Sequence, residues 1–301
     1  MKVTLDWLGT ATFRLRIGDL VVFLDAYMDR VPAAPPVGLS SAEVTEADFI
    51  LVGHSHFDHL AGAEIIAANT GAKIIGSNES CRVMRERGVP EGQLLPSPGG
   101  ERHRLSPDVT VRVFPSVHSC TWILTNVGSG DAETGHTGLT QDERATLPGL
   151  TQHIMGLISA GGEEGQMLLR HVQESAGSLS DGGPLVYLIE TPAGRIFYQD
   201  SSGCWTGVLQ RLQADVAILA AAGRPNVDGE PIQGSMADFI TMEAKALGAR
   251  TVIIGHQDDW MPPVTRSDFD MGPVRAELAR QAPSATLLEP GYIEGTVLLG
   301  D

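Results

Sequence analysis

The chain of 301 residues is acidic, because 21 Lys and Arg stand against 37 Asp and Glu, a formal net charge of −16, and 42% of it is hydrophobic. Nucleic acids and anionic membrane surfaces both attract clustered Lys and Arg, so this balance argues against either partner. No apolar run reaches the roughly 18–20 residues of a spanning helix and the start lacks a signal-peptide pattern, so we expect a cytoplasmic protein.

The N-terminal third predicts strands alternating with helices. Short apolar or β-branched runs predict strands at 3–8, 12–17, 20–25, 48–52, 72–75 and 109–114. Helical patterns fall at 60–69 and 77–87. Gly18-Asp19 suits the turn of a hairpin, and the continuous apolar run at 48–52 is typical of a strand buried on both faces.

The second half repeats this order of elements. A hairpin at 185–200 matches the one at 12–25, and both end in a strand followed by an aspartate, Asp200 and Asp25. The apolar run at 214–218 then parallels the earlier one at 47–51, although short apolar strands also match by coincidence. We interpret the chain as two similar β-rich halves in a single domain over 1–301, with an α/β layered fold.

Residues 119–184 interrupt this pattern. They contain a loop rich in Gly, Ser, Thr and Asp at 126–143, helical stretches near 148–160 and 163–176, and a Gly-rich end at 180–183. Long insertions in compact domains often cover a functional site, so we interpret this one as a lid or wall. A surface excursion or an oligomer contact is the alternative, and the sequence leaves a homo-oligomer open.

The strongest functional signal lies at 54–59, which reads His-Ser-His-Phe-Asp-His directly after a buried strand and a glycine. Burying these side chains together is costly unless something pairs with them, and a divalent cation does so. Imidazole and carboxylate are typical ligands of Zn²⁺. His54 and His56 can turn towards one ion, while Asp58 and His59 on the next turn face a second.

The remaining ligands are expected at the ends of other strands. His118 follows the strand at 109–114, Asp200 closes the strand at 195–199, and His256 follows an apolar run and a glycine, as His54 does. Strand ends converge on one edge of a sheet, where α/β proteins usually place their sites. Together with the residues at 54–59 these supply five His and two Asp, enough for two ions.

These residues resemble, in order and context, the metallo-β-lactamase superfamily. The opening at 7–13, Trp-Leu-Gly-Thr-Ala-Thr-Phe, and the hairpin ending Leu24-Asp25 resemble its ascorbate-6-phosphate lactonase-like branch. The resemblance implies an αββα sandwich of two mixed sheets flanked by helices, with a dinuclear site. That site is usually zinc, although Mn²⁺ or Fe²⁺ also occurs. Position 56 is His where the diiron relatives have Glu, which favours zinc.

The resemblance also implies the ligand assignment. One ion would be held by His54, His56 and His118, and the other by Asp58, His59 and His256, with Asp200 bridging them. Asp200 lies in Gln-Asp-Ser-Ser-Gly, where the family commonly has Gly-Asp-Thr.

Two ions at one site would create a strongly positive centre in an acidic protein. That charge lowers the pKa of a bound water towards about 7, so hydroxide forms at neutral pH. A hydroxide bridging the ions would then be the nucleophile, with Asp58 orienting it. We therefore assign catalytic roles to Asp58 and Asp200.

Aromatic residues follow several of the predicted ligands. Trp122, Trp205 and Trp260 come shortly after His118, Asp200 and His256, and Tyr27 follows Asp25. We expect these four to line an apolar substrate pocket, although core packing is the alternative for each. We expect Asp25 to hydrogen-bond a ligand imidazole and fix its tautomer, the alternative being an ordinary turn carboxylate.

The sequence therefore predicts a zinc-dependent hydrolase of a small organic molecule, with a lactone or ester as the favoured bond. No Lys/Arg cluster for a phosphate is evident, which favours a neutral or aromatic substrate. Hydrolytic dehalogenation and phosphodiester cleavage on the same site stay open. So does a non-catalytic metal-binding or sensing protein, although every ligand position is filled.

Overall fold

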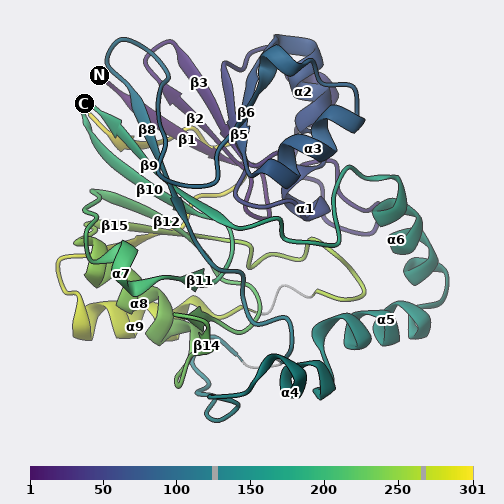
Figure 1. Ribbon diagram of the computed structural model, residues 1–301. Coiled ribbons are helices and arrows are strands. Elements are labelled where there is room, and N and C mark those ends of the chain that lie inside the picture. The colour runs from purple at the N-terminus through teal and green to yellow at the C-terminus, as the bar shows by residue number, and fades with distance from the viewer. Residues whose placement is uncertain (124–127, 266–268, 301) are drawn as a thin grey trace.

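The computed structural model of the chain describes residues 1–123, 128–265 and 269–300, and its centre is formed by two seven-stranded sheets (Figure 1). The first sheet has the order β17-β1-β2-β3-β4-β5-β6. Its strands are β1 (Val3–Trp7), β2 (Phe13–Ile17), β3 (Leu20–Leu24), β4 (Phe49–Leu51), β5 (Lys73–Gly76), β6 (Leu94–Pro96) and β17 (Thr296–Leu299).

The second sheet has the order β16-β15-β12-β10-β9-β8-β7. Its strands are β7 (Arg102–Arg104), β8 (Thr110–Pro115), β9 (Leu185–Thr191), β10 (Gly194–Gln199), β12 (Val216–Ala220), β15 (Thr251–Gly255) and β16 (Thr286–Leu288). Three short strands form a separate small sheet, β11 (Gly203–Cys204), β13 (Asn226–Val227) and β14 (Glu230–Pro231).

Helices flank the outer faces of both sheets (Figure 1). The α-helices are α1 (Phe57–Leu60), α2 (Ala63–Thr70), α3 (Asn78–Glu86), α4 (Gln141–Thr146), α5 (Leu150–Ala160), α6 (Gly162–Glu174), α7 (Thr206–Leu209), α8 (Met236–Leu247) and α9 (Met271–Gln281). Two 3₁₀ helices are η1 (Ser41–Glu43) and η2 (Glu91–Gln93). Among the described residues, none of the helices combines the length and the apolar character needed to cross a membrane.

Three apolar clusters hold these layers together. One fills the space between the two sheets and includes Phe13 and Tyr187. A second packs the first sheet against α2 and α3 through residues such as Ile66, and a third packs the second sheet against α8 and α9 through residues such as Phe239. This is the layer order helix, sheet, sheet, helix, so the predicted αββα fold class is confirmed.

The two sheets share the pairing that the repeated elements predict. β2 and β3 pair antiparallel and β4 and β5 follow in parallel, while β9 and β10 pair antiparallel and β12 and β15 follow in parallel. The two aspartates predicted to be equivalent, Asp25 and Asp200, therefore follow matching strands, β3 and β10.

The expected helix at 60–69 is two helices. Gly62 separates α1 from α2 with φ of +97°, a left-handed conformation that favours glycine, and a Cβ there would overlap the carbonyl oxygen of Ala26. The chain therefore leaves the 54–59 motif through a sharp turn before α2 begins.

The insertion predicted at 119–184 contains α4, α5 and α6, which lie to one side of the sheets (Figure 1). Residues 124–127 of this prediction lie outside the described residues. Ile158 of α5 and Leu168 of α6 are buried in an apolar cluster with Tyr27 and Trp260, so the α5–α6 hairpin packs against segments that flank the predicted metal ligands.

Candidate metal centre

The structure brings the seven predicted ligands together at the carboxyl ends of the strands. His54 lies three residues after the end of β4, and His118 lies three residues after the end of β8. Asp200 and His256 come immediately after β10 and β15. Three groups of side chains place one donor atom each within 4.8 Å of one another, namely His54, His56 and His118; Asp58, His59 and His256; and His54, His59 and Asp200.

The group of Asp58, His59 and His256 has the more regular geometry. Asp58 Oδ2 lies 3.3 Å from His59 Nε2 and 3.2 Å from His256 Nε2, and the two Nε2 atoms are 3.2 Å apart. Ligand atoms at zinc bond lengths of about 2.0–2.1 Å in a tetrahedron lie about 3.3 Å from each other. These three donors therefore have the spacing that a zinc ion requires.

The group of His54, His56 and His118 lies beside it. His54 Nε2 is 3.0 Å from His56 Nδ1, and the ring of His118 is 4.7 Å from that of His54 and 4.9 Å from that of His56, measured between centroids. The rings of His54 and His59 are 4.0 Å apart and so place the two groups next to each other. An all-imidazole set is a normal coordination environment for zinc.

Burial keeps the first group of imidazoles neutral. Burial lowers the pKa of His54 well below its usual value, lowers that of His56 to about 4, and lowers that of His118. Because a metal ligand must present an unprotonated nitrogen, these rings are in the state needed for binding at neutral pH.

The second group carries opposite charges. Burial favours the neutral form of Asp58, but His59 and His256 outweigh it and hold the pKa of this carboxyl well below its usual value. Burial likewise opposes a charge on His59, but Asp58, Asp200 and Asp25 outweigh it and raise the pKa of the ring. The three carboxylates thus favour a positive charge at this ring, and a metal ion on Nε2 would supply that charge in place of the proton.

Two further carboxylates lie behind the rings. Asp25 Oδ2 is 2.6 Å from His59 Nδ1, while Asp25 also accepts hydrogen bonds from the Gly53 amide at 2.9 Å and the Tyr198 hydroxyl at 2.7 Å. Asp200 Oδ2 is 2.6 Å from His54 Nδ1 and 3.2 Å from His59 Nδ1. All of these side chains are buried.

Comparison with known proteins agrees with this geometry. A family profile described as "Beta-lactamase superfamily domain" matches residues 21–147, which include the 54–59 motif and His118. Residues 21–147 of the chain thus resemble the domain of this superfamily. A protein of Pyrobaculum islandicum named "UPF0173 metal-dependent hydrolase" is 31% identical over 142 residues, 45% of this chain and 62% of that protein.

Other relatives cover less of their own length. A protein of the same name from Myxococcus xanthus is 34% identical over 40% of this chain and 41% of that protein. The chain thus matches about half the length of these curated relatives. Among solved structures, Igni18, described as a novel metallo hydrolase from Ignicoccus hospitalis, has a TM-score of 0.62 at 14% identity and covers 100% of this chain and 99% of that chain.

A second solved structure, an isothiocyanate hydrolase from Delia radicum gut bacteria, has a TM-score of 0.57 at 13% identity over the whole of both chains. At these identities the likeness shows a shared fold.

The four aromatic residues predicted to line a substrate pocket lie in different surroundings. Trp260 packs edge-on against His256, with ring centroids 5.0 Å apart, and Tyr27 packs edge-on against Trp260 at 6.0 Å. Trp122 lies under the guanidinium of Arg144, and Trp205 is 38% exposed at the start of α7.

Sequence reasoning missed Phe57, which lies inside the motif itself. Its ring contacts Tyr27 at 5.6 Å and Trp260 at 6.1 Å, so it completes an aromatic wall beside the Asp58 group. The aromatic side chain between His56 and Asp58 was the available signal.

The end of the insertion lies against the metal-binding motif. The Ser55 amide donates to the carbonyl oxygen of Asp181 at 2.9 Å, and the Ser178 amide donates to the carbonyl of Ser55 at 2.8 Å. These backbone hydrogen bonds fix the motif loop from one side.

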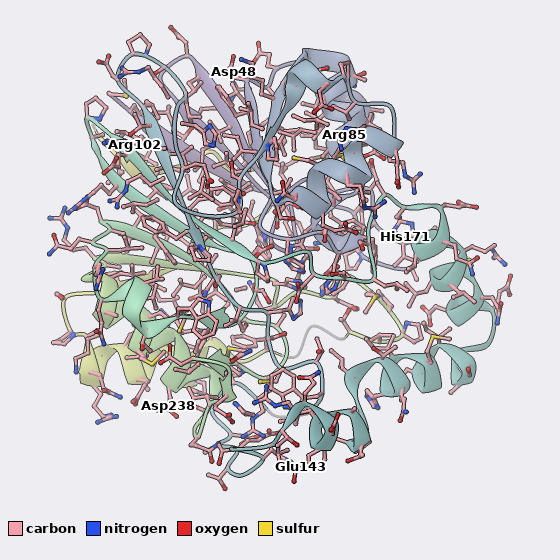
Figure 2. The ribbon with its side chains drawn as sticks, viewed as in Figure 1. Asp48, Arg85, Arg102, Glu143, His171 and Asp238 are labelled. Carbon is pink, nitrogen blue, oxygen red and sulfur yellow. The ribbon has the colours of Figure 1, made fainter. Side chains whose placement is uncertain are left out.

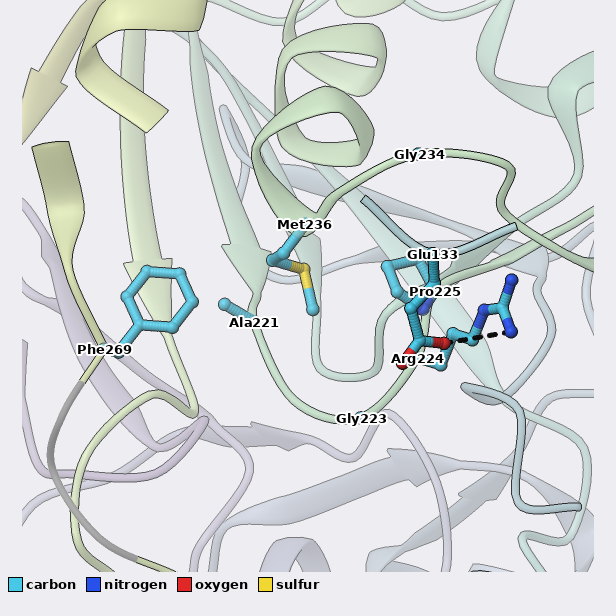
Figure 3. Close-up of a pocket in the computed structure, with 8 residues that line it drawn as sticks. All are labelled: Glu133, Ala221, Gly223, Arg224, Pro225, Gly234, Met236 and Phe269. Carbon is cyan, nitrogen blue, oxygen red and sulfur yellow. Dashed lines mark ion pairs between the residues drawn. The ribbon is translucent and has the colours of Figure 1, made fainter. Parts of the chain in front are cut away.

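A small cavity lies at the carboxyl end of β12 (Figure 3). Its volume is about 110 Å³, and its lining includes Ala221, Met236 and Phe269. The ion pair between Arg224 and Glu133, 2.9 Å long, lies at one side of it (Figure 3). None of these residues was predicted to be functional, and the available signal was Arg224, a charged residue four positions after the apolar strand β12.

The cavity borders the metal centre through its backbone. The Ala221 amide donates to the carbonyl of Gly255, next to His256, and the Asn226 side chain donates to the carbonyl of His118. The loop 221–226 therefore connects the cavity lining to two of the strand ends that carry predicted ligands.

Proposed function

We propose that the protein is a metal-dependent hydrolase with two zinc ions, one held by His54, His56 and His118 and the other by Asp58, His59 and His256. The observation that carries this proposal is the triangle of Asp58 Oδ2, His59 Nε2 and His256 Nε2, with sides of 3.2 to 3.3 Å. The names of the curated relatives support it. Mn²⁺ and Fe²⁺ are the alternative metals.

Bound dications at such a site supply Lewis-acid polarisation of the scissile group and a water acidic enough to attack it near neutral pH. The chain's own contribution is to hold the donors in place. Asp25 accepts a hydrogen bond from His59 Nδ1, which leaves Nε2 as the unprotonated nitrogen. The carboxylate of Asp58 stays ionised and is available to orient the attacking water.

The surroundings favour a small neutral or aromatic substrate with a lactone or ester bond. Phe57, Tyr27 and Trp260 form an apolar wall next to the Asp58 group. Two deeply buried arginines near the site are already paired, Arg30 with Asp258 and Arg224 with Glu133, so neither offers a free charge to a phosphate.

We also propose that the protein works in a reducing compartment such as the cytoplasm. Cys81, Cys120 and Cys204 are all buried free thiols. Burial raises the pKa of Cys81 to about 11 and that of Cys120 to about 12, which keeps both unreactive.

Elemental analysis and a substrate panel test the function. Zinc-loaded protein, assayed on lactones, esters, isothiocyanates, phosphodiesters and halogenated aromatics, should hold about two ions per chain and hydrolyse a lactone or ester fastest. Loss of activity with a chelator and its recovery with zinc are expected. Less than one tightly bound ion, or metal binding with no turnover on the whole panel, would instead favour a sensing or metal-binding protein.

A variant pair tests the ligand assignment. His56→Ala removes one donor of the imidazole group, so it should lower the zinc content towards one ion and reduce turnover by at least about 100-fold. The matched control is His103→Ala, because His103 lies on the edge strand β7 and bonds Ser97. Equal activity of the two variants would refute the assignment of His56.

A further inference from the structure

The last part of the insertion, residues 178–182, lies against the metal-binding motif. After α6 the chain passes α1 on its way to β9 (Figure 1). On this path it meets Ser55, a fully buried residue that separates His54 from His56 in the sequence. Because neighbouring residues share one backbone, contacts that hold Ser55 also restrain the main chain of both histidines. The 178–182 segment can therefore act on the group of imidazole donors.

Every hydrogen-bonding group of Ser55 is bonded to this segment. The Ser55 amide donates to the carbonyl of Asp181 at 2.9 Å, and the Ser55 hydroxyl donates to the carbonyl of Ser180 at 2.8 Å. The Ser55 carbonyl accepts a hydrogen bond from the Ser178 amide at 2.8 Å. These three bonds fix both the position and the orientation of Ser55, and moving the segment away would leave buried polar groups unpaired.

Gly182 allows the segment to come this close to the motif. A Cβ at Gly182 would lie 2.5 Å from the Ser55 hydroxyl oxygen and from Cβ of Glu79. Gly183 has the same left-handed backbone, with φ of +84° against +72° for Gly182, but a Cβ there would meet no atom of the described residues within 4 Å. The close contact therefore belongs to position 182 and not to its neighbour.

Helix α3 holds the segment from outside the metal centre. The Ser178 hydroxyl donates to the Glu79 carboxylate at 2.7 Å, and the Arg87 guanidinium donates to the carbonyl of Ser175 at 2.6 Å. Glu79 lies in α3 and Arg87 directly follows it. The α5–α6 hairpin packs elsewhere, on the cluster that contains Tyr27. The two parts of the insertion thus have separate supports.

The segment also brings a negative charge to the imidazole donors. Burial lowers the pKa of both His56 and His118, and the Asp181 carboxylate opposes the shift at each ring. A carboxylate that favours positive charge at these two rings also favours a cation bound between them.

The Asp58 group is held by other parts of the chain. Asp25 Oδ2 lies 2.6 Å from His59 Nδ1, and the His256 amide donates to the carbonyl of Thr10 at 2.7 Å. Within the part of the chain that the structure describes, no hydrogen bond of the 178–182 segment reaches a residue of this group. The two donor groups therefore depend on different segments.

We propose that the 178–182 segment positions His54 and His56 through Ser55, and that it sets the affinity for the ion of the imidazole group but not for the other ion. This inference rests on the proposed metal centre and deepens it. It divides the insertion into a hairpin that packs on the aromatic wall and a segment that supports one ion. Ser55 is a positioning residue, because it acts through the two histidines beside it.

Two neighbouring glycine variants test the proposal through zinc binding. Gly182→Ala and Gly183→Ala both place a side chain on a left-handed residue, but only the first overlaps Ser55. We expect Gly182→Ala to bind one zinc ion about 10- to 100-fold more weakly than the wild type, measured by competition with a chelator. Gly183→Ala should keep the wild-type affinity for both ions. Equal affinities of the two variants would overturn the proposal.

Anomalous diffraction at the zinc edge identifies the weakened ion. In crystals of Gly182→Ala at limiting zinc, we expect a reduced peak at the imidazole group of His54, His56 and His118. The peak at the Asp58 group should keep its wild-type occupancy. Equal losses at both positions, or a loss at the Asp58 group alone, would contradict the proposed selectivity.

Ser55→Ala is an independent variant. It removes the hydrogen bond to the Ser180 carbonyl and leaves the two backbone bonds of residue 55 possible, so it should weaken the same ion by about 10-fold. Ser159→Ala is the control, because the Ser159 hydroxyl also donates to a backbone carbonyl, that of Met155, but on the exposed face of α5. Equal zinc affinities of these two variants would show that the hydroxyl of Ser55 does not position the ligands.

Thermodynamic linkage provides a test without any substitution. If the closed segment strengthens the binding of an ion, the ion must favour the closed segment by the same factor. Saturating zinc should therefore slow hydrogen exchange of the Ser178 amide, which bonds Ser55, by about 10- to 100-fold. The Ser175 amide, which bonds the carbonyl of His171 at 3.0 Å, should keep its rate. No slowing at Ser178, or equal slowing at both amides, would contradict the proposal.

These experiments separate the inference from the proposed function. A wild-type chain that binds fewer than two zinc ions would show that the metal centre itself is wrong. A wild type with two ions, together with equal affinities of Gly182→Ala and Gly183→Ala, would refute only the role of the segment. Circular dichroism shows whether each variant is folded. If Gly182→Ala is unfolded, Ser55→Ala and hydrogen exchange of the wild type decide the question.

Discussion

Two residues at the site have backbone conformations that side-chain-bearing residues rarely adopt. Asp25 and His256 lie immediately after β3 and β15 with φ of +53° and +68°. Such conformations cost on the order of 1–2 kcal/mol each. Backbone hydrogen bonds hold them, from the Asp25 amide to Leu51 at 2.8 Å and from the His256 amide to Thr10 at 2.7 Å. The strained turns direct both side chains towards the sheet edge where the donors meet.

Glu243 of α8 is a buried carboxyl group that the proposed chemistry does not use. One oxygen accepts a hydrogen bond from Gln199 at 2.9 Å, and the other has no partner among the described residues. Burial raises the pKa of Glu243 from 4.5 to about 8. The folded protein therefore keeps a proton that the unfolded chain releases above about pH 4.5, and stability falls as pH rises through this window.

Glu243→Gln should remove this pH dependence. The free energy of unfolding of the wild type, minus that of the variant, should fall by about 1.4 kcal/mol per pH unit between pH 5 and 8, as measured by urea denaturation. Taking the difference between the two proteins cancels the contributions of other titrating groups to the free energy of unfolding. A difference that does not change with pH would show that Glu243 is ionised in the folded protein.

At the residue scale, the sequence could predict which side chains gather but not how they contact each other. The donors at 54–59, His118 and His256 are recognisable because each follows an apolar strand. The position of Asp200 depends on the missing side chain of Gly53, 147 residues away. A contact of this kind appears only when the two sheet edges are built.

At the scale of elements, the α5–α6 hairpin is the part of the insertion closest to the aromatic wall. Ile158 and Leu168 pack into the cluster of Tyr27 and Trp260, and His171 of α6 is hydrogen-bonded to the Tyr27 hydroxyl at 3.0 Å. Figure 2 labels His171 at the point where α6 approaches the rest of the molecule. The insertion is therefore placed to influence the substrate side of the site.

Leu168→Ala should loosen this contact without affecting the ions. We expect the variant to lose about 2–5 kcal/mol of stability locally, to change KM and the ranking of substrates, and to keep the wild-type zinc content. Glu164→Ala is the control on the exposed face of the same helix. Zinc loss in Leu168→Ala would show that the hairpin supports the metal centre itself, and an unchanged substrate ranking would show that it does not shape the pocket.

Most element positions could be predicted because apolar residues recur at different spacings along strands and along helices. The predicted helices at 148–160 and 163–176 correspond to α5 and α6 within two residues at each end. The expected single helix at 60–69 failed because Gly62 allows a turn that periodicity does not detect. The small sheet of β11, β13 and β14 has strands of only two residues, too short for any pattern.

At the scale of the whole molecule, a buried ion pair joins distant segments. Arg30 pairs with Asp258, which also accepts hydrogen bonds from the Thr10 amide at 3.1 Å and the Tyr292 hydroxyl at 2.7 Å. The side chains of Arg30 and Asp258 are only 3% and 8% exposed. This network connects four segments. They are the loop with Thr10, the loop after β3 with Arg30, the loop after His256 with Asp258, and the C-terminal segment with Tyr292.

Asp258→Asn should leave the buried charge of Arg30 without its counter-ion. We expect a loss of about 3–5 kcal/mol in the free energy of unfolding, because an uncompensated buried cation is costly. Asp259→Asn is the matched control, since Asp259 contacts Thr265 at 3.2 Å and takes no part in the network. Similar stabilities of the two variants would mean that water or another group compensates Arg30.

The overall architecture was predictable because the chain repeats one order of hairpin and parallel strands. Both halves show it in their apolar runs, and both sheets have the corresponding pairing. The pairing of β17 with β1, which brings the last strand beside the first, was not predictable. Nothing local marks a partner nearly 300 residues away.

The central claim is that the strand ends of both halves assemble one centre for two ions. Anomalous diffraction at the zinc absorption edge, from crystals of the zinc-loaded protein, tests it most directly. The account predicts two peaks, one among His54, His56 and His118 and one among Asp58, His59 and His256. No peak at either position, or zinc bound only elsewhere on the chain, would contradict it.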